Sequence, residues 1–287
     1  MVKKMPEATS PPLSADDAEI FAAVAAKQRE RAFHETNAGI WTLRLLLTLT
    51  LLGVWELSSG PLIEPFWISS PSEIIGRIYE WFTTGEIYPH LQATLTSMVL
   101  GFSIGALAGV AFGLVLGSSP LMADVLRPFL VGFYGMPKVA LIPLFILWFG
   151  VGMQSVVILV ALTVFFPVFY NTFSGLREID RSLLDSVRLF GAGWPFVFLR
   201  VALPAARHWI FAGLRISVRY ALTTTIYGEL VGGSRGIGFL LEYSASRFDT
   251  RSVMAAIVIL GVCGLLLVAG VARSERAFGS QSARPFA

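Results

Sequence analysis

Near the middle of the chain, residues 185–204 read DSVRLFGAGWPFVFLRVALP. This stretch carries charges and two glycines, whereas the sequence on either side is dominated by long apolar runs. Apolar residues recur at spacings of three and four up to Phe190, and Gly191 is suited to stop that helix. Pro195 suits the first turn of a second helix, which we expect to end at Pro204. The sequence therefore predicts two short helices joined by a glycine turn, with Asp180 or Ser182 as the first N-cap.

The apolar runs that flank this stretch are long enough to cross a membrane. Of the 287 residues, 55% are hydrophobic and 14% charged, whereas soluble domains carry about 25% charged residues. A membrane-spanning helix needs roughly 17–25 apolar residues. Six segments qualify, at about residues 40–57, 91–116, 125–149, 153–175, 209–230 and 253–271. We expect an all-α integral membrane protein with six transmembrane helices in one domain, residues 39–272.

Lysine and arginine residues predict the orientation of these spans, because they gather on the cytoplasmic side of membrane proteins. With both termini cytoplasmic, fourteen of them fall inside, four outside and four within spans. The opposite orientation would invert this ratio. We therefore expect cytoplasmic N- and C-termini, and a cytoplasmic central loop at residues 176–207.

The segments outside the spans have three further features. Residues 1–38 form a predicted cytoplasmic tail, in which an amphipathic helix at 14–33 lies on the membrane surface or, alternatively, is a solvated helix without attachment. A short amphipathic helix begins at Ser72, between the first two spans. Residues 273–287 form the predicted C-terminal cytoplasmic tail.

The sequence lacks the residues that a disulfide, a metal site, a catalytic cluster or an ATP-binding loop would require. One cysteine, Cys263, allows no disulfide within the chain, and the three histidines are too scattered to predict a metal site or a catalytic cluster. A P-loop requires GxxxxGK[ST], and none of the four lysines stands in that pattern. We expect a non-enzyme that binds no metal and no nucleic acid and cannot hydrolyse ATP alone.

A stripe of glycines marks the second span. Five glycines are spaced four residues apart, so they share one face of a helix and allow another helix to approach closely. These are Gly101, Gly105, Gly109, Gly113 and Gly117. The sequence leaves open whether the stripe meets this chain or a second copy.

Polar residues within the spans are candidates for a translocation path, because burial in lipid is costly for them. Lys138 lies between Pro137 and Pro143, which interrupt helical hydrogen bonding, and its ammonium would suit an anionic solute. Alternatively, Lys138 reaches the cytoplasmic surface or pairs with an acid. The other candidates are Tyr170, Asn171, Tyr220, Thr223, Thr224, Tyr227 and Glu229. Hydroxyls bonded to their own helix backbone are the alternative for the threonines.

The central loop resembles the signature of ABC importer permeases, which reads EAA, three residues, Gly, nine residues, then I-x-L-P. Asp185, Ser186 and Val187 stand at the EAA positions, with Asp in place of Glu and Ser and Val in place of the alanines. Gly191 stands at the Gly position. Val201, Leu203 and Pro204 follow with the matching spacing.

The resemblance extends over residues 66–272. The segments PSEIIGRIYEWFTTGEIYPHLQATL (71–95), ALIPLFILWFGVG (140–152) and ELVGGSRGIGFLL (229–241) are similar to permeases of the nitrate, sulfonate, taurine and bicarbonate uptake group. It implies the type I importer fold, in the bacterial inner membrane, with a coupling helix in the central loop.

The resemblance also implies a set of partners. The loop would contact a cytoplasmic ABC ATPase, which binds ATP and Mg²⁺, with Asp185 as a hydrogen-bonding group and Trp194 as an anchor. A second permease copy, as a homodimer, would enclose the path, and a periplasmic binding protein would deliver a small, anionic solute. A pyrimidine-type vitamin precursor remains an alternative solute, and an ATP-independent secondary transporter an alternative class.

Overall fold

The structure, a computed structural model, describes residues 37–64, 66–180, 182, 186, 187 and 189–279. The chain divides into two units, Met1–Leu62 and Ile63–Ala287. The first unit contains α2 (Asn37–Ser58), whose length and apolar composition suit a membrane span. The helix predicted at 14–33 lies outside the described residues.

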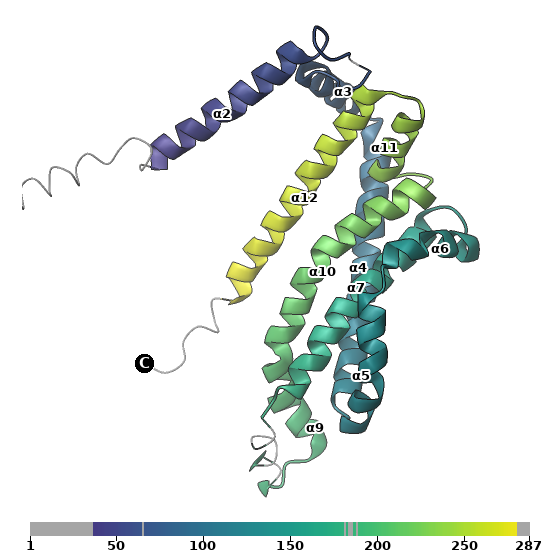
Figure 1. Cartoon of the computed structure of the whole chain (residues 1–287). Helices are drawn as coiled ribbons and strands as arrows, with labels where there is room; N and C mark the ends of the chain where they lie inside the picture. The colour runs from purple at the N-terminus through teal and green to yellow at the C-terminus, as the bar shows by residue number, and fades with distance from the viewer. Residues whose placement is uncertain (1–36, 65, 181, 183–185, 188, 280–287) are drawn as a thin grey trace, which may run out of the picture. The chain divides into compact units, whose positions relative to one another are not determined.

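The described part of the second unit is built from helices and loops (Figure 1). They are α3 (Pro71–Thr84), α4 (Ile87–Gly117), α5 (Pro120–Gly135), the 3-10 turn η2 (Lys138–Leu141), α6 (Ile142–Phe149), α7 (Met153–Arg177), α9 (Trp194–Val197), the π-helical turn η3 (Phe198–Ala202), α10 (Leu203–Gly232), α11 (Ile237–Ser246) and α12 (Thr250–Gly279). Among the described residues of the whole chain, five helices are long and apolar enough to span a membrane, and α5 with α6 supplies a sixth span as a bent pair. The all-α, six-span expectation is confirmed.

The third span, expected at about residues 125–149, is a broken helix, as the prolines in its sequence predict. Met136 is extended after α5. The helix axis bends by 82° between α5 and the helical segment Lys138–Phe149, which consists of η2 and α6. Pro137 explains the break, because a residue that precedes proline is disfavoured in helical geometry and proline has no N–H for the helix ladder. The predicted interruption is confirmed at Pro137, whereas Pro143 lies in the first turn of α6 and does not break it.

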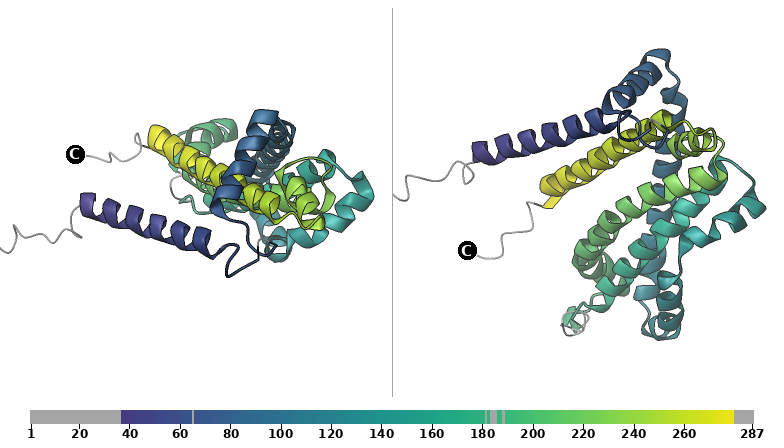
Figure 2. Two further views of the ribbon diagram at one scale, coloured as in Figure 1. Left: turned by 90° about the horizontal axis from the view of Figure 1, so that it is seen from above. Right: turned by 45° about the horizontal axis from the view of Figure 1, so that its top comes forward.

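The core of the second unit is formed by α7, which packs against α4 on one side and α10 on another (Figures 1 and 2). Val156, Val160, Val164 and Val168 recur every four residues on α7 and are all buried. This spacing places them on one helix face. The valine face of α7 is therefore the centre of the apolar core.

The glycine stripe of α4 contacts α7 of the same chain. A Cβ atom at Gly101 would lie 2.6 Å from Cβ of Val160, and one at Gly109 would lie 2.9 Å from Cβ of Val168. Gly105 and Gly113 meet the same helix. These separations are shorter than van der Waals contact, so α4 and α7 reach this distance only because the side chains are absent.

The two ends of the α4–α7–α10 bundle carry different elements (Figure 1). One end carries the last turn of α7 and α9, which belong to the central loop at residues 176–207, called the coupling loop below. At the opposite end, α11 follows α10, and Gly152 N–H donates a 2.7 Å hydrogen bond to the carbonyl oxygen of Gly232. α12 packs against α3 and α11 there and runs to Gly279, beyond the expected end of the sixth span at residue 271.

The short helix expected from Ser72 is α3, which begins one residue earlier. Ser70 caps it by accepting a hydrogen bond from Glu73 N–H on Oγ (3.3 Å), and Pro71 takes the first helical position. Its buried face carries Ile74 and Trp81. α3 is therefore amphipathic, as its sequence predicts.

Candidate functional site

The coupling loop exposes large apolar side chains beside a sharp turn. Leu189 is 87% exposed and Phe190 is 93% exposed. Gly191 follows with φ +81°, in the left-handed region that an L side chain rarely adopts. A Cβ at Gly191 would meet nothing within 4 Å, so backbone geometry, not crowding, favours glycine here.

The start of the coupling loop is held by local hydrogen bonds. Asp180 accepts a 2.8 Å hydrogen bond from Ser182 N–H, in keeping with its predicted capping role. This backbone bond and the Ser182 hydroxyl lower the pKa of Asp180 below its usual value. Ser186 donates from its hydroxyl to the carbonyl oxygen of Ser182 at 2.7 Å. Asp185 lies outside the described residues.

The second part of the loop does not end at Pro204. α9 begins at Trp194, continues through the π-turn η3, and enters α10 at Leu203. Leu203 N–H bonds to the carbonyl oxygen of Phe198, five residues earlier, and Pro204 then occupies the first turn of α10, where its missing N–H is tolerated. The expected stop at Pro204 was wrong. Val201 and Leu203 are half-buried.

A second group of candidate residues meets at mid-bundle. The Nζ atom of Lys138 lies 5.3 Å from the ring centre of Tyr134 and 5.1 Å from that of Phe166. It also donates a 2.6 Å hydrogen bond to the carbonyl oxygen of Tyr134. The rings of Tyr134 and Tyr170 are 5.5 Å apart, and the side chain of Tyr220 on α10 lies near that of Tyr134. We call Tyr134, Lys138, Phe166, Tyr170 and Tyr220 the aromatic–lysine cluster.

The aromatic–lysine cluster joins residues from α5, η2, α7 and α10. Tyr134, Tyr170 and Tyr220 are 40–47% exposed, and Lys138 is half-buried. Sequence reasoning named Lys138, Tyr170 and Tyr220 but missed Tyr134 and Phe166. Tyr134 precedes Lys138 by four residues, which was the available signal. The sequence carries no such signal for Phe166.

The other path candidates fall into an exposed and a buried set. Thr223 and Tyr227 share the exposed face of α10 with Tyr220, and Thr223 donates to the carbonyl oxygen of Arg219 (3.0 Å). In contrast, Thr224 is 3% and Glu229 1% exposed. These two side chains are buried inside the protomer and do not share that face.

Asn171 lies at the contact between α7 and α10. Its Nδ2 donates to the carbonyl oxygen of Pro167 at 2.8 Å, and a Cβ at Gly213 would lie 3.0 Å from the Asn171 Cβ. The side chain is half-buried. The arrangement makes Asn171 part of a helix contact beside the cluster.

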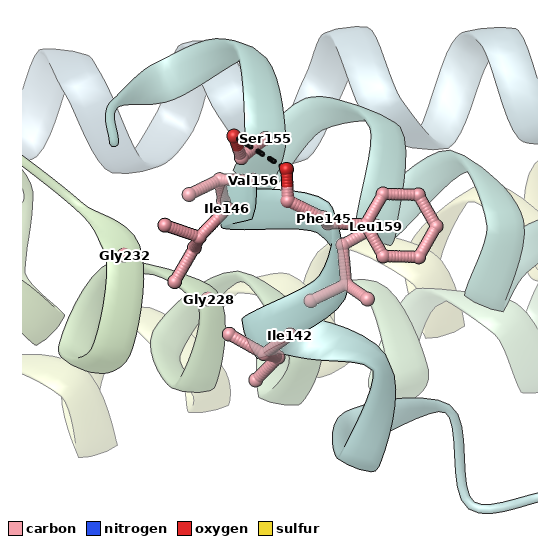
Figure 3. A pocket seen from close by; sticks show the side chains of 8 residues that line it. All are labelled: Ile142, Phe145, Ile146, Ser155, Val156, Leu159, Gly228 and Gly232. Atoms are coloured by element: carbon pink, nitrogen blue, oxygen red, sulfur yellow. Dashed lines mark hydrogen bonds between the residues drawn. The ribbon is translucent and has the colours of Figure 1, made fainter. Parts of the chain in front are cut away.

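A small apolar crevice lies where α6 meets α7 and α10 (Figure 3). Ile146 lies beside Gly232, where a Cβ would be only 2.6 Å from Ile146 Cδ1. The crevice has no space for a water molecule. It is a packing contact that seats the second arm of the bent span, and not a solute site. Among the described residues, no group of three or more His, Cys, Asp or Glu side chains could hold a metal ion.

Comparisons with known proteins agree with this arrangement. A family described as "binding-protein-dependent transport system inner membrane component" matches residues 101–279. SsuC of Bacillus subtilis (strain 168), whose name gives it as an aliphatic sulfonates transport permease, is 34% identical over 82% of this chain and 86% of its own length. The formylaminopyrimidine transport permease protein ThiX of Halalkalibacterium halodurans is 30% identical over 80% of this chain and 92% of its own.

A solved structure has the same fold. An inward-facing structure of the MetNI methionine ABC transporter aligns with a TM-score of 0.53 and 20% identity, covering 69% of this chain and 96% of that one. The family match takes in α7, α10 and the whole loop between them. This multi-pass membrane protein, a permease, therefore belongs to the binding-protein-dependent transport system inner membrane component family.

Proposed function

We propose that a separate cytoplasmic ATPase drives this permease by binding the coupling loop, and that the aromatic–lysine cluster forms part of the path of a small anionic solute. The exposure of Leu189 and Phe190 beside the Gly191 turn carries the first part. Two adjacent apolar side chains almost fully exposed at a bend are suited to insert into a partner. This assignment requires the coupling loop, and with it both termini, to be cytoplasmic.

The structure of the loop also supports transmission of movement. α9, η3 and α10 are continuous from Trp194 to Gly232, and α10 contributes Tyr220 to the aromatic–lysine cluster. A displacement applied to α9 by an ATPase would therefore reach the cluster along one helical rod. Asp185 and Trp194 remain predicted contacts of the ATPase.

The aromatic–lysine cluster supports an anionic solute. Lys138 is a cation at mid-bundle, and the exposed tyrosines beside it offer hydroxyl donors. The cluster lies on an exposed face of the protomer, so a second copy facing it would close the path. We place Tyr220, Thr223 and Tyr227 on this path and exclude Thr224 and Glu229, because both are buried.

The relatives give two candidate solute classes. SsuC is named for aliphatic sulfonates, which are anions, and this agrees with Lys138. ThiX is named for a formylaminopyrimidine, and the rings of Tyr134, Phe166 and Tyr170 would suit a planar solute. Of these two solute classes we favour the anion, because Lys138 provides a positive charge at mid-bundle.

The experiment tests binding of the ATPase and uptake separately. Leu189→Asp and Phe190→Asp should abolish co-purification with the ATPase, while Glu178→Gln, at an exposed residue near the start of the loop, should leave it unchanged. Uptake of taurine, an alkanesulfonate and a pyrimidine into proteoliposomes with ATPase and binding protein then ranks the solutes. Solute accumulation by the permease without any ATPase would contradict the proposal.

A further inference from the structure

The buried carboxylate of Glu229 holds the first turn of α11. Its Oε2 atom accepts hydrogen bonds from the Thr94 hydroxyl at 2.8 Å and from Gly238 N–H at 3.0 Å. The Thr94 hydroxyl oxygen in turn accepts from Ile237 N–H at 2.9 Å. Two side chains, from α10 and α4, therefore satisfy the first two backbone N–H groups of α11.

This arrangement replaces an ordinary N-cap. The residue before α11 is Gly236, which has no side chain to cap the helix. The first N–H groups of any helix need acceptors, and a carboxylate is favoured there by the helix dipole. Glu229 and Thr94 supply this cap from other helices, so the cap also fixes where α11 starts relative to α4 and α10.

The loop before α11 is shaped around the same carboxylate. A Cβ at Gly236 would collide with the Glu229 carboxyl group, and Gly236 has φ +122°. A Cβ at Gly238 would lie 2.9 Å from Cβ of Glu229. The carbonyl oxygen of Gly236 also lies 2.9 Å from Nδ1 of His90 on α4. Segment 233–238 is thus held from two helices while Ser234 and Arg235 remain exposed.

We propose that Glu229 and Thr94 are positioning residues that fix segment 233–238, so that Arg235 meets an acidic side chain of the solute-binding protein. This inference rests on the proposed function, in which this end of the bundle faces the periplasm. Arg235 is exposed and positively charged, and charge complementarity therefore favours an acidic partner surface. Glu229 serves the path indirectly, by placing the surface that receives the solute.

Paired variants at Glu229 and Thr94 distinguish the effect of losing a hydrogen bond from the effect of changing the side-chain volume. Glu229→Gln keeps an acceptor for both donors, and Thr94→Ser keeps the hydroxyl. Glu229→Leu and Thr94→Val remove the acceptors at similar volume. The first measurement is hydrogen–deuterium exchange of the peptide spanning 233–246 in the full permease. We expect about tenfold faster exchange in the Leu and Val variants and wild-type exchange in Gln and Ser. Equal exchange in all four would overturn the positioning role.

The second measurement is ATPase stimulation against binding-protein concentration in the assembled transporter. Glu229→Leu, Thr94→Val and Arg235→Ala should each raise the half-saturating concentration by about tenfold, and Glu229→Gln should not. Because Glu229 acts through Arg235, the Glu229→Leu/Arg235→Ala double variant should be no worse than either single variant. Additive losses, or an unchanged half-saturating concentration in Glu229→Leu, would overturn the partner assignment. A wild-type complex that no binding protein stimulates would instead contradict the proposed function, and the exchange measurement would still decide the positioning role.

Discussion

The Nζ atom of Lys138 lies 5.1 Å from the ring centre of Phe166, so the cation that follows the break after α5 rests against the middle of α7. Its backbone acceptor, the carbonyl oxygen of Tyr134, belongs to the last turn of α5. The position of this cation is thus set jointly by a proline break and by a ring from another helix.

Removing the charge of Lys138 should impair transport of an anion. We expect Lys138→Gln to lower the uptake rate by about tenfold, because a hydrogen bond from a charged group to the anionic solute contributes about 1.5 kcal/mol. Phe166→Leu removes only the ring and should have a smaller effect. Uptake into proteoliposomes with ATPase and binding protein measures both, with exposed Arg273→Gln as control. Wild-type uptake by Lys138→Gln would exclude this residue from the path.

Gly191 should be sensitive to any side chain. A left-handed conformation costs an L residue about 1–2 kcal/mol, so Gly191→Val should shift the turn and abolish ATPase-coupled uptake. Gly193→Val is the matched control, since Gly193 has no positive φ and a Cβ there would lie at ordinary contact distance, 3.8 Å from Pro195 Cδ. Membrane insertion should be intact in both variants. If both variants transport equally, the geometry of Gly191 has no coupling role.

Replacing a glycine of the stripe even with alanine, which adds only a methyl group, should destabilise the protein. A Cβ at Gly105 would lie 2.9 Å from Cβ of Val164 and would clash with the carbonyl oxygen of Ala161. Overpacking costs about 1–3 kcal/mol, which exceeds the gain of about 1 kcal/mol in helix propensity. Gly105→Ala should therefore lower the melting temperature in detergent, whereas Gly261→Ala, with open space around its Cβ, should not. An equal rise of the melting temperature in both variants would contradict the close contact between α4 and α7.

Asp249 should make stability depend on pH. It caps α12 by accepting a 3.0 Å hydrogen bond from Ser252 N–H. Burial opposes ionisation, but the Ser252 hydrogen bonds and the nearby Arg77 and Arg251 lower the pKa of Asp249 overall. A lowered pKa stabilises the fold above the unfolded value of about 4, and this contribution is lost as pH falls through the folded value.

Two variants of Asp249 separate its charge from its capping role. Asp249→Ala should cost about 1 kcal/mol at pH 7, and Asp249→Asn less, because asparagine also caps helices. The difference between wild type and Asn should disappear as the pH is lowered below about 4. Melting temperatures in detergent from pH 7 to pH 3 measure this. A difference that grows on acidification would have the wrong sign for this mechanism.

The sequence alone predicted the features that depend on local composition. Apolar run length located the spans, α3 was expected to begin at Ser72, one residue after its actual start, and the spacing of Gly101 to Gly113 indicated a close helix contact. The turn at Gly191 also followed from neighbouring residues. Each of these depends on a few consecutive residues, because helix periodicity, capping and backbone strain are short-range effects.

Only the tertiary structure decided which surfaces meet. It showed that the glycine stripe meets α7, that Phe166 joins Lys138, and that Glu229 is buried against Thr94, 135 residues away in the sequence. The continuity of α9 through Pro204 into α10 likewise depends on a π-turn that residue preferences do not reveal. These contacts follow from how whole helices pack, because the same apolar face can bind lipid, its own chain or a second copy until three-dimensional packing selects one.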